Sequence, residues 1–336
     1  MALKKAVLTA LTIIIFTNIG FSDTFYVDSM SSDSYDGKSW DSAFKTIGKA
    51  VSASRDGDTI IVNEGSYPGG IVFCDDEDLN RAKGNITRTI TSKNPNDRDT
   101  VAHTIIDGNG VNNVIRLCLA AKINLTGFTI RGGVTGIRSD RGAISTISNC
   151  IIEDNKDIGV LIFQSTDVLT NCIVRNNGNA GVIIWSAHGT VKNNLIYDNN
   201  EGISTGGNWT TGIIWNNTIV NNRSYGIRRI GDPNTMVSSC IIWNNKNEME
   251  NCQAKYSCIK DKKDANGAGD ISSDPKFVNA AKKDFHLNAN SPCIDAGDPN
   301  TLYAGTTDLD NKPRISGMRK VLIGDLLTSF QRPSKV

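Results

Sequence analysis

The sequence has almost no net charge and very little histidine, and each of these features argues against a class of function. Its 36 Lys and Arg residues are balanced by 35 Asp and Glu residues, which gives a formal net charge of +1. A nucleic-acid-binding surface needs an excess of basic residues, and this balance predicts none. Only three His residues occur in 336 positions. The eight Cys residues match no zinc spacing, so we expect no metal site of that kind.

Long apolar runs are also missing beyond the N-terminus. Lys4 and Lys5 precede an apolar segment, residues 6–16, which is followed by small residues up to Ser22. This pattern is typical of a signal peptide, with cleavage after Ser22. No later segment is apolar for the length that a membrane span requires. We therefore expect residues 1–22 to be removed and the mature protein to be secreted or periplasmic.

One short phrase recurs through the centre of the chain. The last residues of its six copies are separated by 22, 22, 22, 23 and 23 positions. A fixed period of this size indicates stacked copies of one structural unit, none of which can bury its apolar face alone. The copies are residues 127–133, 149–155, 171–177, 193–199, 216–222 and 239–245.

The interior of each copy decides which unit is repeated. Short runs of Ile, Val, Thr or Leu are separated by Asn and Gly, as in Gly159-Val-Leu-Ile and Gly181-Val-Ile-Ile. No apolar stripe at helical spacing persists across a copy, and the frame of leucine-rich repeats is absent. The pattern predicts an all-β fold in which three short strands per turn stack as a parallel β-helix.

Asn recurs at two phases of the repeat, which supports stacking in register. Turns about 4.8 Å apart let each side-chain amide bond its neighbours above and below. Asn also tolerates the left-handed backbone of a sharp corner. One column is Asn149, Asn171, Asn193 and Asn216, and the other is Asn155, Asn177, Asn199, Asn222 and Asn245.

The cysteines invite a disulfide framework in an exported protein. Cys150, Cys172 and Cys240 share one phase of the repeat, where a small inward residue fits. We expect buried thiols there, because strand-to-strand geometry is poor for a relaxed disulfide, although Cys150 and Cys172 could bridge successive turns. Cys252 and Cys258 lie outside the regular turns and are the preferred disulfide pair.

The repeat divides the chain into regions. Residues 23–110 are expected to form an N-terminal cap and irregular first turns, with a short amphipathic helix within residues 39–51 that covers the open end of the solenoid. Residues 111–246 hold the regular turns, and residues 247–336 hold a surface loop and a closing segment. The acidic run at residues 75–78 is interpreted as a solvated loop rather than a cation site.

The repeat phrases resemble those of the right-handed parallel β-helix in pectate lyases and in secreted bacterial β-helix proteins, over about residues 24–325. The segment Ser291-Pro-Cys-Ile-Asp-Ala-Gly-Asp298 resembles the closing segment of bacterial choice-of-anchor β-helix proteins. That group commonly ends in an Ile-Gly-Ala-aromatic-Glu phrase. Here Ile323-Gly324-Asp325 departs from it, so we expect plain secretion or periplasmic retention rather than surface anchoring.

Residues one period apart should be neighbours on the surface of a β-helix. With Ile137, Val160, Val182, Ile203 and Ile227 pointing inward, the sequence predicts two outward rows. These rows form an apolar, partly aromatic strip with arginines at both ends. The rows are Arg138, Leu161, Ile183, Ser204 and Arg228, and then Asp140, Phe163, Trp185, Gly206 and Ile230.

Such a strip suits a sugar chain, because aromatic faces stack on pyranose rings and Arg pairs with carboxylate or sulfate groups. The predicted substrate-binding residues are Arg138, Asp140, Phe163, Trp185 and Arg228. An equally weighted alternative is that loops cover the strip and make it ordinary packing.

The resemblance to pectate lyases also implies an enzymatic hypothesis, β-elimination on a uronate-containing glycan. That chemistry needs a cation or Arg beside the carboxylate and a base beside the neighbouring C–H group. Ca²⁺ is the cofactor expected if the protein is a lyase, yet no clustered acidic motif is present. A metal-free site would draw on Arg138, Arg141, His188, Tyr197 or Arg228.

Two functions of different classes therefore remain. The first is an exported β-helix that binds extracellular or cell-wall polysaccharide without catalysis, and the second is a polysaccharide lyase. A base and a charge neutraliser converging on one point would favour the lyase. We expect a monomer with no nucleic-acid partner.

Overall fold

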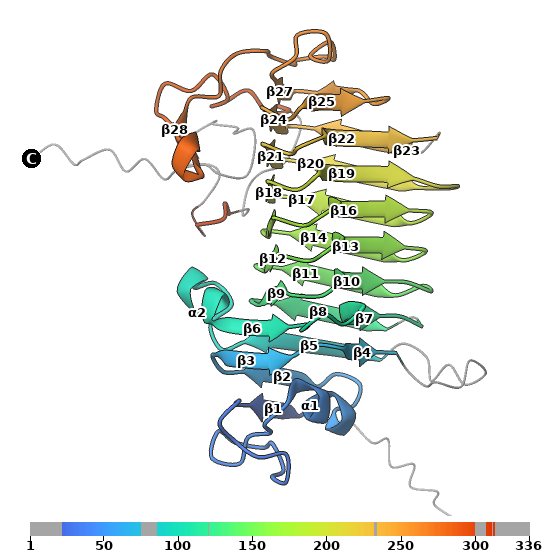
Figure 1. Cartoon of the computed structure of the whole chain (residues 1–336), viewed down its shortest axis with the longest axis vertical. Helices are drawn as coiled ribbons and strands as arrows, with labels where there is room; N and C mark the ends of the chain where they lie inside the picture. Colours follow the sequence, from blue (N-terminus) through green and yellow to red (C-terminus); the bar gives the residue numbers. More distant parts are fainter. Residues whose placement is uncertain are drawn as a thin grey trace, which may run out of the picture.

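Three parallel β-sheets wind into a right-handed solenoid in the computed structural model, which describes residues 22–74, 86–119, 121–231, 234–299, 307–310 and 312. The coils rise from β1 (Thr24–Val27) at the bottom of Figure 1 to β25 (Asn247–Glu250) and β27 (Cys258–Ile259) at the top. The predicted fold class is confirmed. The signal-peptide prediction, the acidic run at residues 75–78 and the segment 323–325 lie outside the described residues, except for Ser22.

Each complete coil contributes one strand to each sheet, in the same order, and the first and last coils are incomplete. The ten-stranded sheet contains β1 (Thr24–Val27), β2 (Thr59–Val62), β5 (Thr87–Ser92), β8 (Lys122–Thr126), β11 (Ile144–Ser148), β14 (Thr166–Thr170), β17 (His188–Lys192), β20 (Thr211–Trp215), β23 (Asn234–Ser238) and β26 (Ala254–Lys255). The nine-stranded sheet contains β3 (Gly65–Pro68), β6 (Thr104–Asp107), β9 (Thr129–Arg131), β12 (Ile151–Glu153), β15 (Ile173–Arg175), β18 (Leu195–Tyr197), β21 (Thr218–Val220), β24 (Ile241–Trp243) and β27 (Cys258–Ile259). The eight-stranded sheet contains β4 (Ile71–Phe73), β7 (Asn113–Leu117), β10 (Thr135–Ser139), β13 (Ile158–Phe163), β16 (Ala180–Trp185), β19 (Glu201–Gly206), β22 (Tyr225–Ile230) and β25 (Asn247–Glu250).

The core consists of inward rows of aliphatic side chains, one row from each sheet. Parallel pairing aligns Ile137 with Val160, Val160 with Val182, Val182 with Ile203 and Ile203 with Ile227, as predicted. All five side chains are fully buried. Burying one such side chain is worth about 1.5–3 kcal/mol, so the rows are the main driving force for stacking the coils.

The column of Asn155, Asn177, Asn199, Asn222 and Asn245 forms a buried hydrogen-bonded ladder, which confirms the prediction for this column. Each amide donates to the next along the column, at 3.0, 3.0, 3.2 and 2.8 Å. The same acceptor oxygen also receives the backbone N–H of the preceding ladder residue, as in Asn177 N to Asn199 Oδ1 at 3.0 Å. The ladder therefore satisfies buried backbone groups that the corner would otherwise leave unpaired.

A column of glycines lies against this ladder because nothing larger fits. A Cβ atom on Gly181 would lie 2.9 Å from Asn199 Nδ2 and 2.8 Å from the carbonyl oxygen of Gly202. Gly159 has the same relation to Asn177, at 2.8 Å. The Asn and Gly of each repeat are thus one packing unit.

The second predicted column behaves differently. Asn149, Asn171, Asn193 and Asn216 adopt left-handed backbone angles, with φ between 53° and 58°, as a sharp corner requires. Within this column the Asn193–Asn216 pair is hydrogen-bonded, at 3.0 Å, whereas the Asn149 amide donates to Asn96. The stacked interior column at this corner lies one residue further along, and it contains Cys150, Cys172, Asn194, Asn217 and Cys240.

The opening unit caps the first coil with the expected short helix, which begins later than the predicted range and ends beyond it. Helix α1 spans Ile47–Ala53 and packs on β1, β2 and β4, with Ile47 and Ala50 buried. The Thr46 side chain accepts from Lys49 N at the N-cap, and the carboxylate of Asp33 accepts from Lys45 N and Thr46 N. These polar contacts begin the helix at residue 47 and hold the preceding residues in turns. A second helix, α2 (Arg98–His103), was not predicted.

The segment predicted as a loop after residue 246 instead begins with another coil. Strands β25, β26 and β27 continue the three sheets as far as Ile259. The chain then forms an antiparallel pair, β28 (Phe277–Asn279) and β29 (Asp284–Leu287), joined by the 3-10 helix η1 (Ala280–Lys282). This pair lies beside β21 and β24 in Figure 1, on the outer face of the nine-stranded sheet. Phe285 and Leu309 bury Tyr197 there.

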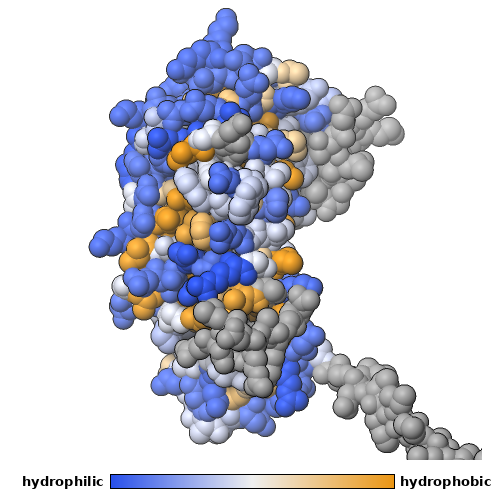
Figure 2. Space-filling model, turned by 90° about the vertical axis from the view of Figure 1, so that its right-hand side faces the viewer, coloured by the Kyte–Doolittle hydropathy of each residue, from blue (hydrophilic) through white to orange (hydrophobic). Residues whose placement is uncertain are grey.

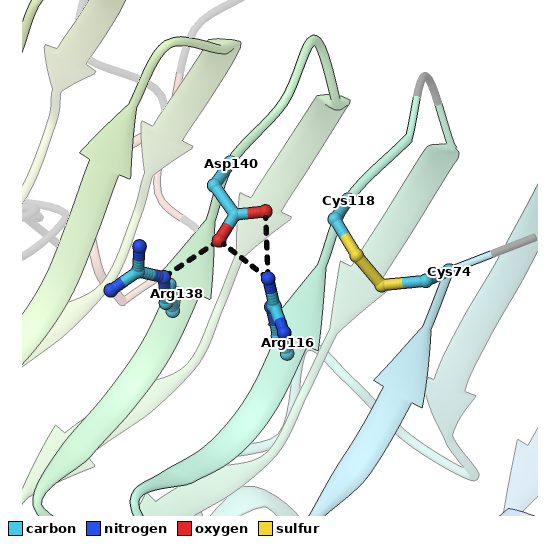
Figure 3. Close-up of a disulfide and its surroundings, with 5 residues drawn as sticks. All are labelled: Cys74, Arg116, Cys118, Arg138 and Asp140. Atoms are coloured by element: carbon cyan, nitrogen blue, oxygen red, sulfur yellow. Dashed lines mark hydrogen bonds and ion pairs between the residues drawn. A yellow bond between two sulfur atoms is a disulfide. The ribbon is translucent and has the colours of Figure 1, made fainter. Parts of the chain in front are cut away.

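One disulfide is present among the described residues, and it is not the predicted one. Cys74 and Cys118, with Cα atoms 4.9 Å apart, are bonded, as Figure 3 shows. They follow directly after β4 and β7, where the backbone leaves the parallel ladder and the side chains can turn toward each other. Cys252 and Cys258 are free, so that predicted pairing is wrong. Cys150, Cys172 and Cys240 are buried thiols, as expected.

The described helices are short, and none has the length and apolar composition of a membrane span.

Replacing Asn199 by Ala should destabilise the protein by about 1–3 kcal/mol, because the Asn177 donors lose their buried acceptor. Asn179→Ala is the matched control, since that side chain is exposed in the neighbouring turn. Urea unfolding followed by circular dichroism measures both variants. Equal midpoints for the two variants would show that the ladder contributes nothing to stability.

The end of the ladder should make stability depend on pH. Asn245 donates to Glu248 Oε2 at 2.7 Å, and burial raises the pKa of Glu248 from 4.5 to about 7. Because the folded-state pKa of Glu248 lies above its unfolded value, the protonated carboxyl group stabilises the fold. This contribution is fully present below pH 4.5 and is lost as the pH rises through about 7. Glu248→Gln should therefore be more stable than the wild type at pH 8, by up to about 3 kcal/mol, with the difference shrinking toward pH 4. Thermal unfolding of both proteins measures this difference. A difference in Tm between Glu248→Gln and the wild type that stays constant from pH 4 to pH 8 would contradict the assignment.

Candidate functional site

The outward face of the eight-stranded sheet carries the predicted strip, and its rows are in register. Leu161 pairs with Ile183, and Phe163 pairs with Trp185, on the adjacent strands β13 and β16. All four side chains are partly exposed. We call Leu161, Phe163, Ile183 and Trp185 the apolar strip. Figure 2 views the side where these strands end, and apolar residues gather there at mid-height between hydrophilic ones.

The Trp185 indole is held in place by two glycines on the next coil. A Cβ atom on Gly206 would lie 2.5 Å from the ring, and one on Gly207 would lie 2.8 Å from Trp185 Nε1. The indole therefore lies over the backbone of residues 206–207, which any larger side chain would prevent. A fixed aromatic ring loses little conformational entropy when it binds a partner.

Arginines stand on both sides of the apolar strip, as predicted, but both groups are already paired. Asp140 Oδ2 accepts from Arg138 Nε at 2.7 Å and from Arg116 at 3.1 Å, as Figure 3 shows. Asp140 is 1% exposed. The substrate-binding role predicted for Asp140 would need an exposed carboxylate, and this carboxylate is buried. Its position is that of a buried counter-ion, and Arg116 is a partner that sequence reasoning missed.

The ion pairs on the C-terminal side of the strip are centred on Arg228. Its guanidinium contacts Glu201 at 3.0 Å and Glu250 at 2.7 Å, and the hydrogen bond to Glu201 raises the pKa of Arg228. Ser204 donates a short hydrogen bond to the same Glu201. With one Arg between two Glu, this cluster carries an excess negative charge, whereas Arg116, Arg138 and Asp140 carry an excess positive charge.

The remaining catalytic candidates do not converge with these clusters. His188 begins β17 on the ten-stranded sheet, where its Nδ1 lies 3.1 Å from Thr211 Oγ1. Tyr197 lies on the nine-stranded sheet, 4% exposed beneath the closing segment, and accepts from Arg175 at 2.8 Å. Arg141 is an exposed residue in a left-handed turn after Asp140. The structure thus distributes the candidates over three sheets.

Metal ligands do not mark the apolar strip in the part of the chain that the structure describes. Among the described residues, no group of three or more His, Cys, Asp or Glu side chains could hold a metal ion. A hollow of about 960 Å³ lies elsewhere, at the C-terminal end of the coil stack, where Met236 and Lys255 line it. Trp209, 73% exposed and three residues beyond Gly206, is another aromatic side chain that sequence reasoning missed.

These features define a right-handed parallel β-solenoid with an aromatic outward face. The family described as "right handed beta helix region" matches residues 55–195 and 99–269, which together cover more than half of the chain. The protein belongs to this right-handed β-helix family, as its repeats indicated.

Solved structures share the fold at low sequence identity. A pectate lyase, Pel9A, superposes with a TM-score of 0.58 at 14% identity and covers 88% of this chain and 97% of its own. A rhamnogalacturonan lyase gives a TM-score of 0.44 at 14% identity, covering 76% and 91%. An alginate lyase from Paenibacillus sp. str. FPU-7 gives 0.37 at 13% identity, covering 62% and 95%. No curated protein sequence matches the chain.

Asp140→Asn should destabilise the protein by about 1–3 kcal/mol at neutral pH, because Arg116 and Arg138 lose their shared carboxylate. Asp154→Asn is the matched control, since Asp154 is exposed and in the left-handed region that Asn tolerates equally well. Urea denaturation at pH 7 compares the two variants. A wild-type midpoint for Asp140→Asn would mean that the carboxylate charge does not hold the arginines.

Proposed function

We propose that this protein binds polysaccharide through the apolar strip on the eight-stranded sheet. The observation that carries the proposal is the alignment of Phe163 and Trp185 on neighbouring coils, where both are partly exposed. Aromatic faces one strand spacing apart, about 4.8 Å, suit the C–H faces of an extended pyranose chain. Leu161 and Ile183 widen the same surface.

The charged residues beside the strip define its ends rather than its centre. Arg138 lies with its guanidinium carbon over the Phe163 ring, 5.7 Å from the centroid, so it contacts the aromatic surface directly. Because Asp140 holds this Arg at 2.7 Å, the arginine is oriented before any ligand arrives. Arg228 is oriented in the same way by Glu201 and Glu250. Hydroxyl groups of a sugar can then accept or donate hydrogen bonds at either end.

The location that fits this function is outside the cytoplasm, either secreted or periplasmic. The Cys74–Cys118 disulfide supports this location, since such bonds persist in oxidising compartments. The shared fold with a protein named a pectate lyase supports a glycan ligand at the level of fold alone.

The proposal is tested by incubating the protein with neutral glycans, polyuronates and sulfated glycans, with Ca²⁺ and with EDTA. Retardation in glycan-containing gels, without new absorbance from unsaturated products, is the expected result. New absorbance would replace the proposal with β-elimination, and its loss in EDTA would identify a Ca²⁺-dependent lyase. The absence of both signals on every glycan would refute a carbohydrate function.

Trp185→Ala should weaken binding by about tenfold or more, measured with the glycan that is retarded most strongly in the gels. An aromatic side chain that becomes buried in an interface typically contributes about 1.4 kcal/mol or more, which corresponds to roughly a factor of ten in affinity. Trp40→Ala is the control, since Trp40 is 38% exposed and packs on Tyr26 in the opening unit, away from the strip. Isothermal titration calorimetry gives both affinities. Unchanged affinity for Trp185→Ala would move the binding site away from the strip.

A further inference from the structure

Two free cysteines meet where the closing segment packs against the last coil. Cys258 lies on β27, the final strand of the nine-stranded sheet, and Cys293 follows β29 in the closing segment. Both side chains are fully buried in a small apolar cluster with Ile241 and Leu287. The neighbouring Cys258 thiol raises the pKa of Cys293, and Cys258 Sγ donates to the carbonyl oxygen of Ser273 at 3.2 Å.

The position of this pair differs from that of the other buried thiols. Cys150 and Cys172 lie on successive parallel coils, and the Cys172 sulfur already accepts the backbone N–H of Cys150, at 3.4 Å. Cys293 belongs to no coil. It is held by its own turn, in which Ser291 Oγ accepts from Cys293 N at 3.1 Å and donates to the carbonyl of Pro275. The approach of the two sulfurs is therefore set by packing between segments, outside a strand ladder.

We propose that Cys258 and Cys293 form a second disulfide that ties the closing segment to the last coil. The two thiols lose two protons and two electrons, and one S–S bond forms. The electrons reduce a disulfide oxidant, either oxidised glutathione or an oxidoreductase with a reactive disulfide, to two thiols by exchange through a mixed disulfide. The Cys74–Cys118 bond shows that this chain supports disulfide chemistry.

The bond must form during folding rather than afterwards. Exchange requires a thiolate that the oxidant can reach, and both sulfurs are shielded once the closing segment is packed. The link would close 34 intervening residues into a loop, including β28 and β29. Closing a loop of this size lowers the entropy of the unfolded chain and so favours the packed closing segment.

The experiment refolds the full reduced chain in a mixture of reduced and oxidised glutathione and follows the Cys74–Cys118 bond as an internal reference. When that bond is complete, the protein is denatured in a thiol-alkylating reagent without reductant, digested and analysed by mass spectrometry. The expected product is a peptide pair linked through Cys258 and Cys293, with Cys150, Cys172, Cys240 and Cys252 alkylated. Alkylated Cys258 and Cys293 beside an intact Cys74–Cys118 bond would overturn the proposal.

The variant Cys293→Ala distinguishes a specific Cys258–Cys293 disulfide from unspecific oxidation of the free cysteines. In Cys293→Ala, the Cys258 thiol should become alkylated in nearly every molecule while Cys74–Cys118 stays bonded. If Cys258 pairs instead with Cys252, the oxidation is unspecific and the proposal fails. The peptide map of the wild-type chain decides the matter even if this variant refolds poorly.

Discussion

The structure depends on a close approach of adjacent coils at the corner where glycine meets the asparagine ladder. Asn199 can bond Asn177 and Asn222 only if the coils keep constant register, and Gly181 leaves the space that the Asn199 amide occupies. A shift of one residue would bring side chains into that space and turn the aliphatic rows outward. The hydrophobic rows supply most of the free energy, whereas the ladder selects one register among those that bury similar apolar area.

The outward surface inherits this register. Phe163 and Trp185 are neighbours because Val160 and Val182 are neighbours beneath them, so the proposed binding surface follows from the core. The ion pairs follow in the same way, since Arg116 and Arg138 lie on adjacent strands and share Asp140 at the strand end. The solenoid thus aligns groups that are far apart in sequence.

Much of this arrangement could be predicted because a fixed period converts sequence position into spatial position. The inward row from Ile137 to Ile227 and the ladder from Asn155 to Asn245 are both as expected. The period does not show which of two consecutive asparagines at a corner points inward, so the interior position of Asn194 was assigned to Asn193. The period also gives no information outside the regular repeats. Helix α2 and the Cys74–Cys118 pair were missed for this reason.

The sequence also did not show which charged side chains are buried or which charges are paired. Asp140 was expected on an exposed row, yet two arginines enclose it, because one of them belongs to a coil before the recognised repeats. Tyr197 looked available as a base, but the closing segment, which lies some 85 positions later, covers it. Both side chains are buried by contacts between segments that share no repeat.

Stacking of the coils in constant register is tested most directly by a distance between two spin labels. Ile144 and Asn234 are both exposed and occupy one row of the ten-stranded sheet, four coils apart. Pulsed electron paramagnetic resonance on labels at these two positions should give one narrow distribution centred near the expected backbone separation of about 19 Å. A broad distribution, or one centred far beyond that separation, would contradict the account.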